Sequence, residues 1–189
     1  MKKLILASTS RYRRELLEKL SLPFDCENPL VDESILKKEN LKPDELSRQL
    51  ATLKAMAVLK KFPEGYVIGS DQVCALGHEI LSKPGSKENA LLQLKKMQGK
   101  IHELHTSVCI AYGKEKKVFT NTVKLKMFTL TDQEIEDYLV LDSPFDCAGS
   151  YKIESYGIKL FEQIVMNDHT AIIGLPLIEL HSELKKLGF

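Results

Sequence analysis

Five charged side chains in the first half of the chain are of the types that act on phosphate groups. The cations are Arg13, Lys54 and Lys83, and the carboxylates are Glu33 and Asp71. Such cations neutralise phosphate oxygens, while paired carboxylates hold a divalent cation and activate water. The set as a whole therefore suits phosphoryl hydrolysis, although each member also has an ordinary structural explanation.

The turn that carries Ser8 and Ser10 has the composition of an anion site. It follows a predicted buried strand at 4–7 and precedes a predicted helix, whose free N–H groups and dipole attract anions. Arg13 and Arg14 lie in the first turn of that helix, where the dipole disfavours cations. A bound anion would offset this cost, and the alternative is a simple N-cap with two solvated arginines.

The other charged positions depend on the elements predicted around them. Lys54 lies on or beside the apolar stripe of a long predicted helix, where it either extends along the surface or points at a phosphate. Asp71 follows a short apolar strand at 66–69, and open α/β sheets carry catalytic groups at such strand ends. Glu33 and Lys83 lie in predicted loops, where solvated side chains are the ordinary alternative.

Composition argues against several classes of protein. Lys plus Arg (27) nearly balances Asp plus Glu (26), so the chain lacks the basic excess of a general nucleic-acid binder. No run approaches the roughly 18 apolar residues of a membrane span, and the apolar start is too short for a signal peptide. The four cysteines form no CxxC pair, which indicates reduced thiols. We therefore expect a cytoplasmic protein with no nucleic-acid or membrane partner.

Periodicity and capping signals predict alternating helices and strands. Helices are predicted at 43–61 and 86–98, after a capping box at 131–134, and from Pro176 to Gly188; strands are predicted at 101–112 and 117–130, with a hairpin at 73–81. This order predicts an α/β fold with a mixed, twisted sheet flanked by helices. The length suits one domain, 1–189, either ordinary or elongated with two lobes around a central cleft.

The motifs, taken in order from residue 4 to about 180, resemble those of the Maf family. The matching segments are 6–10 with Arg13, Asp32-Glu33, Leu50-Ala51 with Lys54-Ala55, 69–73, Lys83-Pro84, 147–150 and 174–176. No P-loop and no GxGxxG is present, so the two commonest nucleotide motifs do not compete with this interpretation. Each matching motif alone is weak, but jointly they are highly specific.

The resemblance implies a fold similar to that of inosine triphosphatases and an activity on nucleoside triphosphates. The bond between the α and β phosphates would be hydrolysed, giving the monophosphate and pyrophosphate with the help of a divalent cation, Mg²⁺ or Mn²⁺. The implied residues are Asp71 as proton acceptor with Lys54 and Lys83 for catalysis, Glu33 and Asp71 for metal, and Ser8, Ser10, Arg13 and Arg14 for substrate binding. The division of metal binding and proton transfer between the two carboxylates stays open.

Three positions resemble the subgroup of 7-methyl-GTP pyrophosphatases, namely Tyr12, Gln72 and Glu154. The dTTP/UTP subgroup usually has Thr and Gln at the last two. An aromatic ring and a carboxylate suit a cationic methylated guanine, and the glutamine offers both a donor and an acceptor. Two residues depart from the family pattern, Arg11 in place of Pro and Ser107 in place of Gly, and neither removes a proposed catalytic group.

A nucleoside triphosphate is the expected partner, and the sequence leaves a homodimer open. The alternatives are a pyrophosphatase for dTTP/UTP or other modified nucleotides, and a non-catalytic nucleotide-binding regulator linked to septum formation. The presence of Asp71 and both lysines favours an enzyme.

Overall fold

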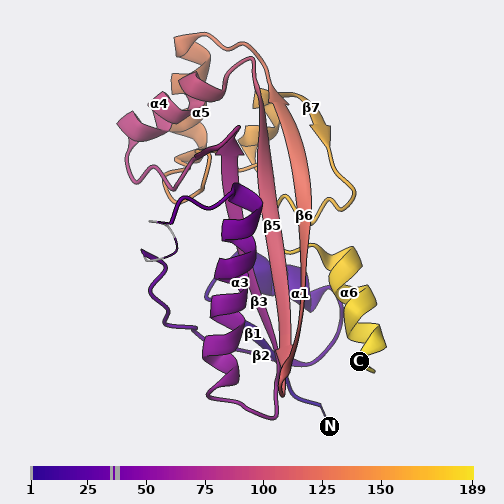
Figure 1. The fold of residues 1–189 in the computed structure, drawn as a ribbon. Coiled ribbons are helices and arrows are strands. Elements are labelled where there is room, and N and C mark those ends of the chain that lie inside the picture. The colour runs from indigo at the N-terminus through magenta and orange to yellow at the C-terminus, as the bar shows by residue number, and fades with distance from the viewer. Residues whose placement is uncertain (1, 35, 37–38) are drawn as a thin grey trace. The chain divides into compact units, whose positions relative to one another are not determined.

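The chain forms an α/β fold in which helices flank one seven-stranded mixed sheet, as the sequence predicts (Figure 1). The structure is a computed structural model that describes residues 2–34, 36 and 39–189. Its strands are β1 (Leu4–Ala7), β2 (Phe24–Cys26), β3 (Tyr66–Leu76), β4 (Glu79–Ile80), β5 (Ile101–Tyr112), β6 (Glu115–Met127) and β7 (Phe161–Val165). Its helices are α1 (Arg11–Glu18), α3 (Pro43–Leu59), α4 (Lys87–Met97), α5 (Asp132–Asp142), the 3-10 helix η1 (Tyr156–Leu160) and α6 (Leu177–Lys186).

The strand order is β2-β1-β3-β5-β6-β7, with β4 paired to β3. Strand β1 runs parallel to both β2 and β3, so that Leu4 lies opposite Phe24 on one side and Tyr66 on the other. The pairs β3–β4 and β6–β7 are antiparallel. The sheet is therefore mixed because a parallel N-terminal part continues into hairpin-like pairs. Within the described ranges, no helix is both long and apolar enough to cross a membrane.

Two compact units divide the chain. Unit 1 comprises Met1–Gln72, Thr106–Asn121 and Asp168–Phe189, and unit 2 comprises Val73–His105 and Thr122–Asn167. The boundaries fall within β3, β5 and β6, so each of these strands contributes residues to both units.

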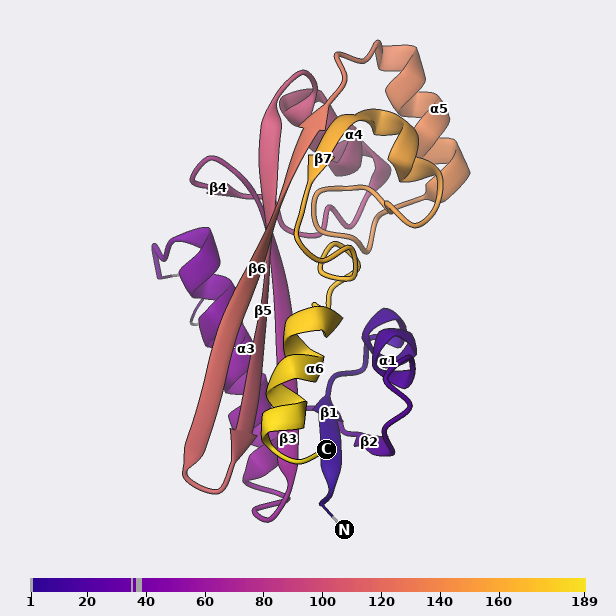
Figure 2. The same cartoon turned by 90° about the vertical axis from the view of Figure 1, so that its right-hand side faces the viewer.

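The strands of unit 1 are covered by apolar side chains on both faces. Alternation along β1 sends Leu4 and Leu6 to one face and Ile5 and Ala7 to the other. The first face packs against leucines of α1 and α6, and the second packs against α3. Figure 2 shows α3 on one side of these strands and α1 and α6 on the other. Helices therefore bury both faces of β1, with α1 and α6 on one face and α3 on the other.

Gly69 in β3 allows α3 to approach the sheet unusually closely. A Cβ atom at this position would lie 2.2 Å from the carbonyl oxygen of Ala51 and 2.6 Å from the backbone nitrogen of Ala55. Both alanines are fully buried. Glycine on the strand and alanine on the helix therefore bring the two backbones together one residue away from Ser70 and two away from Asp71.

Unit 2 contains the packed helices α4 and α5 and a buried aromatic cluster. His102 of β5 is fully buried, and its Nε2 lies 3.0 Å from the hydroxyl of Tyr151, whose ring meets Phe161 edge-on. The other ring nitrogen of His102 is buried and has no hydrogen-bond partner among the residues that the structure describes, and burial lowers the pKa of this imidazole to about 4. His105 instead contacts Glu103 and Thr122. The two histidines thus have separate partners.

The main departure from the predicted elements concerns β3. The strand predicted at 66–69 continues to Leu76, so Asp71 lies inside a strand rather than at its end. The predicted strand end was wrong because Ser70-Asp71 stays extended and continues directly into the first arm of the predicted hairpin, so that one strand covers both. Strand β5 has the predicted bounds, and the capping box of α5 is present. The cysteines carry free thiols, with Cys74 and Cys109 buried.

Candidate functional site

Unit 1 brings together three of the predicted charged residues, Glu33, Lys54 and Asp71. The Lys54 ammonium lies 2.8 Å from Oε1 of Glu33 and 2.5 Å from Oδ1 of Asp71. All three side chains are largely removed from solvent, with Lys54 and Asp71 exposed by only 12% and 13%. The contact follows from the close approach of α3 to β3 at Gly69, since Lys54 precedes Ala55 on that helix. Lys54 therefore joins two carboxylates instead of extending into water.

The carboxylate pair has the donor chemistry of a divalent-cation site. Two carboxylates meet here, and Mg²⁺ and Mn²⁺ prefer such oxygen ligands. Among the described residues, no group of three or more His, Cys, Asp or Glu side chains lies close enough to enclose a metal ion. Glu33 and Asp71 thus fit a cation that takes its remaining ligands from water or from phosphate oxygens.

Helix α1 turns one arginine inward. Ser10 is the N-cap, and its Oγ accepts from the backbone nitrogen of Arg13, while Ser8 Oγ accepts from the nitrogen of Ser10. Arg13 Nε donates to the carbonyl oxygen of Gly174 at 3.0 Å. Burial lowers the pKa of the Arg13 guanidinium, and the nearby carboxylates of Asp71 and Glu33 act in the opposite direction. A simple N-cap accounts for Ser10, but it gives no reason for the inward-turned cation of Arg13 in the first turn of the helix.

The neighbouring arginines lie on the exposed face of α1. Arg11 contacts Glu15 at 2.6 Å and Arg14 contacts Glu18 at 3.0 Å, each pair four residues apart. Such pairs compensate cations in a first turn. Arg11, at the first helical position where the family commonly has Pro, therefore changes the surface and leaves the turn intact. Tyr12 in the same turn is 37% exposed, so its ring is accessible.

The segment from Asp168 to Gly174 organises this region through its backbone, and no sequence signal had singled it out as a whole. Asp168, only 2% exposed, accepts from the backbone nitrogens of Thr170 and Ile178 at 2.8 Å each. The segment is thereby tied to the first turn of α6. Gly174 has a φ of 121°, and its carbonyl oxygen accepts from both Arg13 Nε and Ser70 Oγ.

Gln72 is held by the same segment. Its Nε2 donates toward Thr106 Oγ1 and the carbonyl oxygens of Ala171 and Ile172, at 2.9 to 3.1 Å. Carbonyl oxygens can only accept, so the amide nitrogen must face them. The amide nitrogen of Gln72 is thus engaged within the protein. Gln72 was expected to offer both a donor and an acceptor, and its donor is already used by these contacts within the protein.

Ser107, the second departure from the family pattern, belongs to a chain of hydroxyls. Its Oγ lies 2.7 Å from Ser47 Oγ on α3 and 2.8 Å from Thr120 Oγ1 on β6. Ser47 in turn donates to the carbonyl oxygen of Asp44. A glycine could not make these bonds, so Ser107 links α3, which carries Lys54, to β5 and β6.

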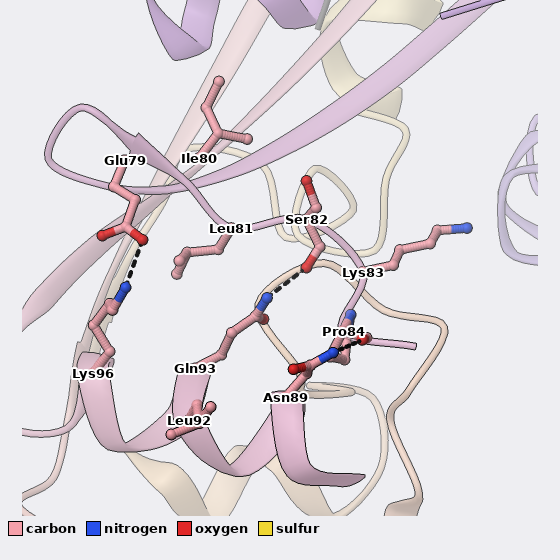
Figure 3. A pocket seen from close by; sticks show the side chains of 10 residues that line it. All are labelled: Glu79, Ile80, Leu81, Ser82, Lys83, Pro84, Asn89, Leu92, Gln93 and Lys96. Carbon is pink, nitrogen blue, oxygen red and sulfur yellow. Dashed lines mark hydrogen bonds and ion pairs between the residues drawn. The ribbon is translucent and has the colours of Figure 1, made fainter. Parts of the chain in front are cut away.

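The remaining predicted residues, Lys83 and Glu154, belong to unit 2. Both are exposed. Lys83 lines a pocket of about 310 Å³ between the segment after β4 and helix α4 (Figure 3). Glu154 lies in a turn before η1, shortly after the segment 147–150.

The chain belongs to the family of Maf-like proteins, whose model matches residues 3–187. It is similar over nearly its whole length to curated proteins named 7-methyl-GTP pyrophosphatase. One from Bdellovibrio bacteriovorus is 47% identical over 179 residues, which are 95% of this chain and 94% of the relative. One from Thiobacillus denitrificans is 46% identical over 98% of this chain and 92% of its own. A third, from Xanthomonas axonopodis pv. citri, is 44% identical over 100% and 98%.

Proposed function

We propose that this protein is a nucleoside-triphosphate pyrophosphatase that converts 7-methyl-GTP to its monophosphate and pyrophosphate. The observation that carries the proposal is the cluster of Glu33, Lys54 and Asp71 in a chain 44% to 47% identical to proteins of that name. Both the family and the site chemistry favour an enzyme over a binding regulator, because a site built only to bind an anion gains nothing from two carboxylates.

In the proposed reaction, Asp71 accepts a proton from water as the water oxygen attacks the α-phosphorus. The bond from that phosphorus to the oxygen bridging it to the β-phosphate then breaks, releasing pyrophosphate. Lys54 engages Oδ1 of Asp71, so Oδ2 is the atom that takes the proton. A general base of this kind contributes about 10² to 10⁴ in rate.

The other groups in unit 1 bind and orient. Arg13, fixed through Nε by the carbonyl of Gly174, presents positive charge near both carboxylates and suits a phosphate oxygen. Ser8 and Ser10 form the turn at the N-terminus of α1, where the dipole favours the same anion. A divalent cation, Mg²⁺ or Mn²⁺, held by Glu33 and Asp71, would neutralise charge developing on the phosphates. Arg14 and Lys83 enter the proposal from the motif alone.

Base selection is assigned to Tyr12, Gln72 and Glu154. The accessible Tyr12 ring suits a cationic methylated guanine, and a carboxylate such as that of Glu154 accepts from its N1–H and amino group. Gln72 contributes through Oε1, since its nitrogen is engaged elsewhere. We further propose a cytoplasmic reaction by a single functional domain that includes both units; a homodimer is compatible with it.

The deciding experiment measures kcat/KM for 7-methyl-GTP, GTP, dTTP and UTP with Mg²⁺ and with Mn²⁺, following pyrophosphate release. We expect 7-methyl-GTP to be hydrolysed much faster than the other three. A preference for dTTP or UTP would overturn the substrate and leave the reaction type intact. Nucleotide binding without pyrophosphate release under any metal would overturn the enzyme.

A further inference from the structure

The backbone on either side of Lys83 is held by two amide side chains of α4. Asn89 Nδ2 donates to the carbonyl oxygen of Pro84 at 2.9 Å, and Gln93 Nε2 donates to the carbonyl oxygen of Ser82 at 2.8 Å. Asn89 and Gln93 are four residues apart, so they lie on one face of the helix. The Ser82 carbonyl belongs to the peptide group just before Lys83, and the Pro84 carbonyl belongs to the peptide group that follows Pro84. The segment is therefore held at one point before the lysine and at one point after it.

The orientation of Gln93 is fixed from its other end. Its Oε1 accepts from Ser150 Oγ at 2.7 Å, and Ser150 is fully buried with a left-handed backbone, φ 63°. A carbonyl acceptor on one side and a hydroxyl donor on the other permit only one placement of the amide nitrogen and oxygen. Gln93 thus connects the segment 82–84 to the segment 147–150 within unit 2.

The side chain of Lys83 points away from the two amide side chains that bind the backbone around it. Figure 3 shows it extending away from Asn89 and Gln93, which reach the backbone from α4. In the pocket that these residues line, Lys96 pairs with Glu79 at 2.6 Å, and the amide nitrogens of Asn89 and Gln93 are engaged by backbone carbonyls. The arrangement thus suits holding a backbone more than holding a ligand.

We propose that Asn89 and Gln93 are positioning residues for Lys83 in the pyrophosphatase reaction. The inference rests on the proposed function, in which Lys83 neutralises phosphate charge. A lysine side chain has four rotatable bonds and its segment is an exposed loop, so the cation is delivered accurately only if its backbone is fixed. Misplacement of a catalytic group by about 1 Å can cost on the order of 10²-fold in rate.

The test is a double-mutant cycle on kcat for 7-methyl-GTP with Gln93→Met and Lys83→Met. Met keeps the length of Gln93 and removes its donor. We expect Gln93→Met alone to lower kcat about tenfold and to lower it no further when Lys83 is already Met. The unfolding midpoint should fall equally in both backgrounds, because the variant also removes the acceptor of the buried Ser150 hydroxyl. Asn89→Leu, on the exposed surface of α4, provides a second variant with the same expected pattern.

Lys96→Met is the matched control, since it removes the ion pair to Glu79 in the same pocket and leaves both carbonyl contacts in place. It should keep the wild-type kcat. Equal losses from Gln93→Met in both Lys83 backgrounds would overturn the positioning role, because a general structural effect does not depend on Lys83. A wild type that releases no pyrophosphate would overturn the proposed function itself. An active enzyme in which Lys83→Met changes nothing would overturn only the role of this segment.

Discussion

Lys54 on α3 and Asp71 on β3 meet at 2.5 Å because the helix and the strand touch, backbone to backbone, at Gly69. The same ammonium also contacts Glu33 at 2.8 Å. One cation is thus shared by two carboxylates in a place largely closed to water. The position of the Lys54 ammonium depends on Gly69, because only a residue without a side chain lets α3 come this close to β3.

Asp71→Asn should fold and lose about two to four orders of magnitude in kcat. Asparagine keeps the volume and an oxygen for Lys54, but it cannot accept a proton at neutral pH. Pyrophosphate release from 7-methyl-GTP measures the loss of kcat, and the thermal midpoint of the same preparation measures whether the variant folds. A folded variant with nearly full turnover would remove Asp71 from the role of base.

Lys54→Met should lower both turnover and stability, because it leaves Glu33 and Asp71 facing each other without a cation. Loss of hydrogen bonds to charged groups costs about 2 kcal/mol. Added Mg²⁺ should raise the thermal midpoint of this variant more than that of the wild type, since a cation can replace the ammonium.

The control for Lys54 is Lys61→Met, which removes a more exposed pair with Glu27 in the same unit. Surface pairs contribute about 0 to 1 kcal/mol, so little change is expected with or without Mg²⁺. Equal responses of both variants to Mg²⁺ would argue against a cation site at the two carboxylates.

Gly69→Ala tests the helix–strand contact. The added methyl would lie 2.2 Å from the Ala51 carbonyl oxygen, so α3 must move away. We expect destabilisation of about 1 to 3 kcal/mol and a fall in kcat, because Lys54 moves with the helix. At Gly65 the added methyl would lie 3.0 Å from Cδ1 of Ile5 and 3.1 Å from the carbonyl oxygen of Phe62, so a smaller effect than at Gly69 is expected. Denaturant unfolding and steady-state kinetics on both variants make the comparison.

Much of this site could be foreseen from the sequence, because its parts are local. The hydroxyl turn before α1, the long helix bearing Lys54 and the bounds of β5 follow from spacing and capping within short windows. The structure brings Lys54 together with Glu33 and Asp71, three of the five charged residues of the expected set, and their joint action stays a prediction.

The rest depends on contacts between distant parts of the chain. Nothing near Asp168 reveals that its carboxylate will cap α6, nor that carbonyls after it will hold Arg13 and Gln72. Strand β7 has mostly exposed side chains and is defined by its pairing with β6, so periodicity gave no sign of it. Asn89 and Gln93 looked like ordinary polar positions on a helix until their acceptors were known.

Tyr12→Ala should raise the KM for 7-methyl-GTP more than that for GTP. Only the methylated ring is cationic, and stacking on a tyrosine face is favourable by about 0.5 to 2 kcal/mol, or roughly 2- to 30-fold in affinity. Glu154→Gln should reduce the same preference. Equal KM increases for both nucleotides would assign Tyr12 to general packing instead.

Buried His102 should make stability depend on acidity. Its pKa is lowered to about 4, so between roughly pH 6.5 and 4 the unfolded chain binds a proton that the folded chain does not. The free energy of unfolding is therefore unaffected by His102 above about pH 6.5 and decreases as the pH falls from there to about 4. The total decrease is on the order of 3 kcal/mol. Midpoints measured from pH 7 to pH 4 for His102→Phe should show a shallower decline. The exposed His78→Gln in the same unit should follow the wild type.

The segment from Asp168 to Gly174 holds Arg13, Ser70 and Gln72 with main-chain oxygens, which every amino acid possesses. Substitutions at Ile172 or Ile173 that preserve packing should therefore be invisible to the site. A substitution at Asp168 should act indirectly, because it removes the hydrogen bonds to the backbone of Thr170 and Ile178 and so loosens the carbonyl groups that bind Arg13 and Gln72. In a library of random variants, Asp168, Thr170 and Gly174 should therefore stay constrained while Ile172 and Ile173 vary, because Thr170 Oγ1 donates to Asp168 and accepts from the backbone nitrogen of Leu177.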